Sequence, residues 1–246
     1  MISGLYSVAT AMDASTKRHE VAAENLAKAQ MPGYRRQVLA NSTFDTVMRP
    51  LPPAAAGSYT SKLLGTTTSP VIHDFSQGVM DQTGRPLDIA MTGDGFLTVE
   101  GPSGALYTRN GSLYVNEQRQ LVTVDNLPVR GTAGPIVVPV GISSEAIQIS
   151  RDGRLSAQGV EFAQFELVSF PDNNALTPAG LTLFSAPNTM VPVATNAEIL
   201  QGHLERGSTS TVDEMINLVT ASRHFDAAQR ALTSIGEALQ KRIGLR

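Results

Sequence analysis

The sequence contains no cysteine and no tryptophan, and aromatic residues make up only 5% of its 246 residues. The absence of cysteine excludes a disulfide framework and any site built on a thiolate. Nor is there an excess of positive charge: 19 lysines and arginines face 22 aspartates and glutamates, which gives a net charge of −3. A dedicated nucleic-acid-binding protein needs a basic face that displaces counterions, so nucleic acid is not an expected partner.

Long apolar runs are missing as well. No stretch approaches the roughly 18 consecutive apolar residues of a membrane-spanning helix, so stable membrane insertion is not expected. The N-terminal stretch MISGLYSVATAMDASTKRHE has no basic segment followed by an uninterrupted apolar run, the pattern of a cleaved signal peptide. The sequence therefore predicts either a cytoplasmic protein or one that is exported without a cleaved signal peptide.

Motifs for catalysis and metal binding are also scarce. The four histidines are scattered, and no zinc-binding H-E-x-x-H, nucleophile elbow or P-loop occurs. The stretch Gly93–Thr98 begins like a dinucleotide fingerprint but lacks the third glycine and a following helix, which favours a turn. We therefore predict no catalytic residue, no metal site and no cofactor, and a protein that is not an enzyme.

The N-terminal region carries an amphipathic pattern. Apolar or small residues recur at spacings of three and four, which is typical of a helix with a heptad seam. The positions are Leu5, Val8, Met12, Ser15, His19, Ala22 and Leu26. Met31 precedes Pro32, and a residue before proline is pushed out of the helical region. We expect a helix over residues 1–30 that ends near Ala29 or Gln30.

The C-terminal region repeats this pattern over residues 206–246. Its seam comprises Met215, Leu218, Ser222, Phe225, Gln229, Leu232, Gly236, Leu239 and Ile243. Asp213 and Glu214 in the first turn suit the helix dipole, and a serine or threonine at 208–210 is expected to cap the start. Because neither seam can be buried within its own segment, the two helices must pair with each other or with other chains.

The middle of the chain predicts a connector over residues 31–70 and an antiparallel β-domain over residues 71–205. The connector is rich in Pro, Ala, Gly, Ser and Thr. In the β-domain, turn signals such as Asn110-Gly111 and Asp152-Gly153 indicate hairpins whose central residues need positive φ. The expected strands are Phe96–Val99, Ala105–Thr108, Leu113–Val115, Leu121–Val124, Ile136–Val138, Ala146–Ile149 and Phe162–Phe170. The predicted class is α+β, with long N- and C-terminal helices that form a coiled-coil layer.

With this layout established, three stretches resemble the flagellar basal-body rod and hook protein family. ENLAKAQMPGYRRQ is similar to the family signature Asn-Asn-Leu-Ala-Asn-x-x-Thr-Pro-Gly-Tyr-Lys-Arg. It matches at Asn25, Leu26, Ala27, Pro32, Gly33, Tyr34 and Arg36. It departs at Glu24, Lys28 and Met31, where the family usually has Asn, Asn and Thr.

The other two stretches lie later in the chain. Residues 77–131 resemble the family pattern Gln-Gly, Thr-Gly-x-Pro-Leu-Asp, Gly-x-Gly-Phe and Tyr-Thr-Arg-x-Gly. Gly202-His203-Leu204-Glu205 is similar to the family's Gly-x-Leu-Glu, but Gly207-Ser208-Thr209 replaces the usual Ser-Asn-Val. Length and the stretch TGRPLDIA look most like the proximal rod protein, and the distal rod protein is the close alternative.

The resemblance implies a structural subunit that assembles helically with its own copies and other flagellar axial proteins in the periplasmic rod. It also implies a second partner, the flagellar export apparatus, which exports such subunits without a cleaved signal peptide. The residues expected at the assembly interface are Leu5, Val8, Met12, Leu26, Pro32, Gly33, Tyr34, Arg36, Met215, Leu218, Phe225, Leu232 and Leu239. Two other classes stay open at this point: a coiled-coil-tethered module that binds glycan or peptidoglycan, and an enzyme with an unrecognised site on the β-domain.

Overall fold

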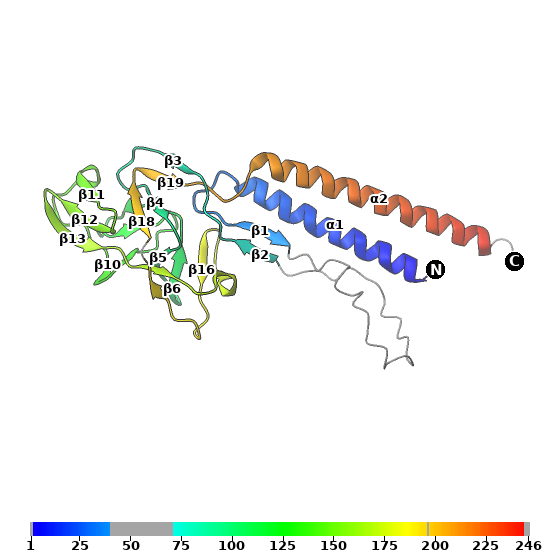
Figure 1. The fold of residues 1–246 in the computed structure, drawn as a ribbon, viewed down its shortest axis with the longest axis horizontal. Coiled ribbons are helices and arrows are strands. Elements are labelled where there is room, and N and C mark those ends of the chain that lie inside the picture. Colours follow the sequence, from blue (N-terminus) through cyan, green and yellow to red (C-terminus); the bar gives the residue numbers. More distant parts are fainter. Residues whose placement is uncertain (1, 40–70, 196, 244–246) are drawn as a thin grey trace. The chain divides into compact units, whose positions relative to one another are not determined.

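The computed structural model describes residues 2–39, 71–195 and 197–243 (Figure 1). The chain divides into two compact units: residues 1–27, 37–72 and 210–246 form unit 1, and residues 28–36 and 73–209 form unit 2. The chain therefore passes between the units after Ala27, Arg36, Ile72 and Thr209. Most of the predicted connector, residues 40–70, lies outside the described residues.

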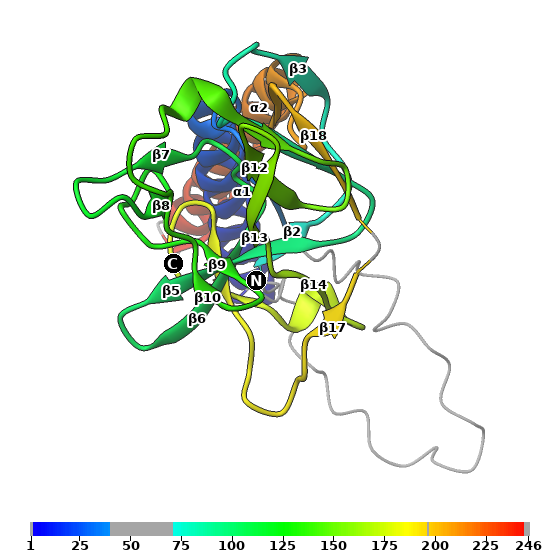
Figure 2. The ribbon, with the colours of Figure 1, turned by 90° about the vertical axis from the view of Figure 1, so that its left-hand side faces the viewer.

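Unit 1 contains the two expected helices, α1 (Ile2–Lys28) and α2 (Thr211–Ile243), which run side by side in opposite directions (Figures 1 and 2). The N–H of Met31 donates to the Lys28 carbonyl at 2.9 Å, so a tight turn ends α1 one or two residues earlier than predicted. Ser210 caps α2, because its Oγ accepts from the Asp213 N–H at 3.4 Å. Among the described residues, no helix is long and apolar enough to cross a bilayer.

Unit 2 is built almost entirely from antiparallel strands (Figure 2). Its main sheet has the order β15-β16-β6-β5-β14-β17, with bounds Thr177–Pro178, Leu183–Ser185, Gly104–Thr108, Phe96–Gly101, Leu167–Ser169 and Val193–Ala194. A second sheet joins β11 (Ile147–Ile149), β12 (Arg154–Ala157) and β13 (Val160–Gln164). The predicted α+β class, with an antiparallel centre, is therefore confirmed.

Short strand pairs complete the fold. They are β3 (Met80–Gln82) with β19 (His203–Glu205), β4 (Ile89–Thr92) with β18 (Glu198–Gln201), β7 (Tyr114–Val115) with β8 (Leu121–Val122), and β9 (Arg130–Gly131) with β10 (Gly134–Pro135). On either side of residues 40–70, β1 (Arg36–Leu39) pairs with β2 (Val71–Asp74). The pairs β3–β19 and β4–β18 bring the two ends of the β-domain sequence together.

The core of unit 2 has an aliphatic and an aromatic part. The aliphatic part includes Leu97, Val99, Leu113 and Leu155, none of which is measurably exposed. The aromatic part gathers Phe96, Tyr107, Phe170 and Phe184, and the rings of Tyr107 and Phe170 meet edge to face at 4.8 Å between centroids. Tightly packed side chains of this kind give unit 2 a core of its own.

Three features of the β-domain differ from the sequence predictions. The expected strand Ile136–Val138 is absent among the described strands, and that stretch holds only an isolated bridge at Val137. Neither Asn110 nor Gly111 has positive φ, so this pair is not the predicted type I′ hairpin. A Cβ at Gly111 would lie 1.8 Å from the Ile89 carbonyl oxygen, so the glycine is needed for close backbone approach. The predicted strand Phe162–Phe170 is broken, because the N–H groups of Phe165 and Glu166 donate to Gly153 and Arg130 instead.

Candidate assembly interface

The face of α2 that packs on α1 shows a heptad rhythm of burial. Its members are buried or half-buried: Glu214, Leu218, Ala221, Phe225, Ala228, Leu232 and Ile235. Ala221 and Phe225 line a cavity of about 250 Å³ together with Ser15 and His19 of α1, which places this stripe between the two helices. We call these seven residues the inner stripe.

The inner stripe is rotated relative to the predicted seam. Leu218, Phe225 and Leu232 lie in it as expected, but Met215 is 52% exposed. The predicted seam positions Ser222 and Gln229 are exposed too, because Ala221 and Ala228 take their place between the helices. The side chain of Leu239 lies outside the described residues, and its predicted contact is not tested.

A second apolar face of α2 points away from the inner stripe. Val212, Met215, Ile216 and Val219 are 65%, 52%, 58% and 49% exposed. Their spacing of three, one and three residues places them on one side of the helix. We call these four residues the outer stripe. It is more apolar than the opposite positions of the inner stripe, Glu214 and Ala221.

On α1, the predicted seam residues Leu5, Val8, Met12 and Leu26 are all half-buried. Ser15, a polar break in that seam, is buried and donates its hydroxyl to the Ala11 carbonyl at 2.8 Å. Asn25 is 1% exposed and bonds the Gln37 backbone twice, through its Nδ2 to the carbonyl at 2.8 Å and its Oδ1 to the N–H at 2.9 Å. This amide therefore fixes the chain that returns beside α1.

The Pro32-Gly33-Tyr34 turn belongs to unit 2. Pro32 is half-buried, and Gly33 has φ of +69°; a Cβ on Gly33 would lie 2.4 Å from the backbone nitrogen of Asn110. Tyr34 is only 2% exposed, so its side chain packs inside the chain and not on the surface where a neighbouring subunit was expected to contact it. Arg36 is half-buried, and its N–H donates to Ser208 Oγ at 3.1 Å.

A buried ion cluster of Arg35, Arg109 and Glu205 lies next to this turn. Glu205 accepts from Arg35 Nη2 at 2.8 Å and from Arg109 Nε at 2.9 Å, and its side chain is fully buried. Gly78 donates its N–H to the same carboxylate at 2.8 Å. Burial lowers the pKa of Arg35, and the Glu205 carboxylate opposes that shift.

The sequence analysis did not single out this cluster. Arg35 is 170 residues from Glu205, and Arg109 is 96 residues from it. No local pattern can join residues so far apart. The only signal was indirect, since Arg109 lies in the Tyr-Thr-Arg-x-Gly match and Glu205 in the Gly-x-Leu-Glu match.

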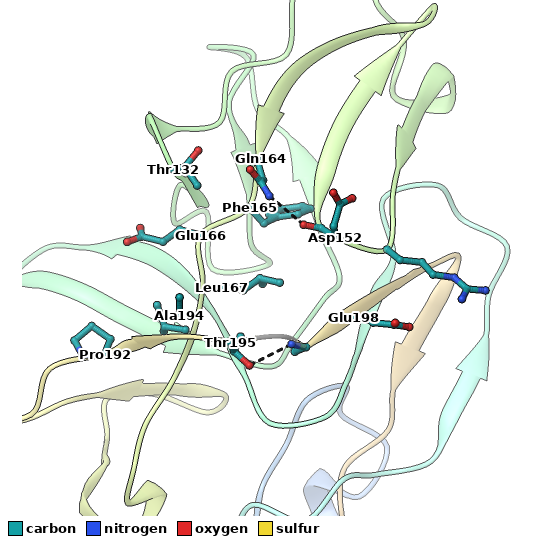
Figure 3. A pocket seen from close by; sticks show the side chains of 13 residues that line it. Thr132, Asp152, Gln164, Phe165, Glu166, Leu167, Pro192, Ala194, Thr195 and Glu198 are labelled. Atoms are coloured by element: carbon teal, nitrogen blue, oxygen red, sulfur yellow. Dashed lines mark hydrogen bonds between the residues drawn. The ribbon is translucent and has the colours of Figure 1, made fainter.

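A hollow on unit 2 has a volume of about 670 Å³ (Figure 3). Phe165, Glu166 and Leu167 form one wall, and Thr195 and Glu198 lie opposite. Hydrogen bonding from Ser150 lowers the pKa of the Asp152 carboxyl at its rim. Within the described residues, no group of three or more histidines or carboxylates could hold a metal ion.

Comparison with known proteins adds the family. A model described as the flagellar hook protein FlgE/F/G D1 domain matches residues 90–157, within unit 2. A model described as the flagellar basal body rod FlgEFG protein C-terminal matches residues 200–245, which include Glu205 and α2.

Full-length relatives agree with these matches. The flagellar basal-body rod proteins FlgF of Salmonella typhimurium and Escherichia coli are 31% and 32% identical to this chain, each over 94% of both sequences. The chain belongs to the flagellar basal-body rod protein family. The rod protein FlgG of Bacillus subtilis is 28% identical over the full length of both chains. Membership confirms the predicted structural role in the basal body, as opposed to an enzyme.

Proposed function

We propose that this rod-family chain is a structural subunit of the flagellar rod that polymerises with its own copies and other axial proteins and so transmits torque through the periplasm. One observation carries the assembly mechanism: α2 has an apolar stripe on each of two faces, and among the described residues only the inner stripe packs on another element. An exposed apolar face on a regular helix marks a surface that another molecule covers.

The outer stripe has the chemistry of a helix-packing surface. Burying an aliphatic side chain completely contributes about 1.5–3 kcal/mol, and Val212, Met215, Ile216 and Val219 are each about half exposed or more. Four such side chains therefore offer several kcal/mol before the entropy of association is subtracted. In this proposal, α1 and α2 form the inner coiled-coil layer of the rod, and the outer stripe packs on a neighbouring subunit.

The proximal position in the rod is the one we propose. The two FlgF relatives are 31% and 32% identical to this chain, against 28% for the FlgG of B. subtilis. The distal position is the second candidate, because the FlgG of Agrobacterium fabrum is 30% identical over 93% of this chain. Subunits at either position would pass through the flagellar export apparatus without a cleaved signal peptide.

Met215→Asp tests this function, because it places a carboxylate in the centre of the outer stripe. An unpaired charge in an apolar contact is costly, so the contact should open while the free protein stays folded. Val160→Asp is the matched control, since Val160 is 68% exposed on β13 of unit 2. We expect normal protein levels for both variants, loss of flagella for Met215→Asp, and full flagella for Val160→Asp. Full flagella with both variants would contradict the proposal.

A further inference from the structure

The buried ion cluster lies where the chain passes between the units. The crossing after Arg36 directly follows Arg35, and the crossing after Thr209 follows Glu205 by a few residues. Arg35 Nη1 also donates to the Ser76 carbonyl at 2.6 Å, close to the crossing after Ile72. The cluster thus ties together three segments of unit 2 that lead to or from unit 1.

Further hydrogen bonds join the same three segments. The N–H of Gly33 donates to the Glu205 carbonyl at 2.8 Å, and the N–H of Ser208 donates to the Tyr34 carbonyl at 3.3 Å. Ser208 Oγ donates to the Asp74 carbonyl at 3.2 Å. Every one of these contacts lies within unit 2, so they fix the entering and leaving strands of the chain to each other on that unit.

The third member of the cluster fixes it to the β-domain. Arg109 follows β6, and its Nη1 and Nη2 donate to the carbonyls of Gly93 and Met91 at 3.0 and 3.2 Å. Its Nε holds the second oxygen of Glu205. A carboxylate bridged by two guanidinium groups has a fixed direction, because each planar guanidinium constrains the geometry of its bonds.

The chemistry of the cluster is better suited to fixing the positions of the chain segments than to raising the stability of the fold. Two guanidinium groups share one carboxylate, and the buried Nε of Arg35 has no hydrogen-bond partner among the described residues. Apolar side chains of similar volume often stabilise such a site equally well or better. Apolar side chains do not form the directional hydrogen bonds that fix where each segment lies.

We infer that the cluster is a joint that holds the entering and leaving segments in one position on unit 2. The segments then do not move relative to unit 2 when force is transmitted from the assembled helices. Arg35 and Glu205 are its positioning residues. This inference rests on the proposed rod function, because a joint of this kind matters only where the helices are held by neighbouring subunits and torque is transmitted.

A distance measurement on the purified full-length protein tests the joint directly. The chain has no cysteine, so Gln30→Cys and Val79→Cys introduce two unique sites for spin labels. Both side chains are exposed and belong to unit 2, one on the entering segment and one beside the backbone that bonds Arg206. We expect a single narrow distance distribution in the parent protein and its loss in Arg35→Met. A narrow distribution in Arg35→Met would overturn the inference.

Two further variants keep the test decisive. Arg85→Met is the matched control, because Arg85 pairs with Asp88 and bonds the Leu113 carbonyl within unit 2, away from the crossings. It should keep the narrow distribution. If Arg35→Met fails to fold, Arg35→Lys decides, since lysine keeps the charge but not the planar fork. The expected result is partial broadening, and an unchanged distribution would contradict the joint.

Motility separates the two proposals. We expect Arg35→Met to lose swimming and Arg85→Met to keep it. If Met215→Asp abolishes flagella but Arg35→Met swims normally, the joint is wrong and the rod function stands. If Met215→Asp supports full flagella, the rod function fails whatever the label distances show.

Discussion

The two units of this chain bury their apolar side chains in different ways. Unit 2 has two clusters of buried side chains, with Leu97, Leu113 and Leu155 fully enclosed. In unit 1, the large apolar residues of α2 are half-buried at best, and Ala221 is the only apolar residue of that helix that is buried among those described. Unit 2 therefore has an enclosed apolar core, whereas the described residues of α2 include a row of exposed apolar side chains.

This difference shows where folding and assembly are encoded. In the first three turns of α2, the outer stripe carries four large apolar side chains, while the inner stripe carries Glu214, Leu218 and Ala221. A helix that folded only onto α1 would place its most apolar face inward. The proposed rod function therefore gives α2 two partners, α1 within the chain and a neighbouring subunit outside it.

The largest expected effect is a loss of folding stability in unit 2. Glu205→Gln removes the charge that compensates two buried guanidinium groups, and breaking a buried ion pair in this way costs about 3–5 kcal/mol. Urea unfolding, followed by near-ultraviolet circular dichroism, measures this loss. Glu198→Gln, at an exposed position of β18, should change the unfolding free energy by less than about 0.5 kcal/mol. Equal stability of both variants would contradict a structural role for the cluster.

Fragments of the chain test whether residues 28–36 are needed for the stability of unit 2. The domain predicted from the sequence, residues 71–205, omits residues 28–36 and 206–209, and therefore lacks Arg35 and Ser208. We expect residues 73–209 to be less stable alone than when residues 28–36 are attached through a short linker. The difference should be about 3 kcal/mol, since Arg35 then pairs with Glu205. Identical unfolding curves for both fragments would show that unit 2 does not need the entering segment.

A pair of charge substitutions compares the two faces of α2 in the free protein. Leu232→Asp removes a half-buried side chain from the inner stripe and should cost about 2 kcal/mol of helix-pair stability. Met215→Asp lies on the outer stripe and should leave the free protein unchanged. Circular dichroism at 222 nm during thermal unfolding distinguishes them. Equal loss of helix in both variants would mean that the stripes are wrongly assigned.

The raised pKa of Tyr107 predicts that unit 2 loses folding stability at alkaline pH. Burial, aided by the Glu166 carboxylate, raises the pKa of Tyr107 above its ordinary value of 10.0. Since the folded pKa lies above the unfolded one, the stabilisation is complete below the unfolded pKa and is lost as pH rises through the folded pKa. Melting temperatures measured from about pH 9 to about pH 11 should fall less for Tyr107→Phe than for the parent protein. A parallel fall in both would contradict this cause.

The smallest effect concerns helix α2 alone. No described atom outside the local helix backbone lies within 4 Å of a Cβ at Gly236, so Gly236→Ala should fit without strain. Alanine favours a helix by about 1 kcal/mol over glycine, and helicity of the free protein should rise. Ala238→Gly, at an exposed position nearby, should lower helicity by a similar amount. A loss of helicity in Gly236→Ala would show that the glycine serves a contact.

Local chemistry in the sequence was sufficient to predict several elements. The three-four spacing predicted both helices, and Pro32 and Gly33 predicted where α1 stops. The expected strands Phe96–Val99 and Ala105–Thr108 lie within β5 and β6, which pair as a hairpin. Each of these signals is contained within a few residues, so no tertiary information was required.

The rest depended on contacts that the sequence does not display. Periodicity could not distinguish Met215 from its neighbour Glu214 as the inner residue, because both fit a helical repeat. Glu214 is 1% exposed, although a charged residue is rarely expected in a seam. The cluster of Arg35, Arg109 and Glu205 is joined only by folding. Tyr34 was expected on the surface, since nothing local reveals that the β-domain covers it.

The central claim is that the outer stripe of α2 contacts neighbouring subunits in the rod. Site-specific photocrosslinking in isolated basal bodies tests it most directly, with the photoreactive residue at position 215 and a control at position 160 on the exposed edge of unit 2. We expect crosslinks from position 215 to axial proteins, including copies of this chain, and few or none from position 160. An assembled rod with no crosslink from position 215 would contradict it.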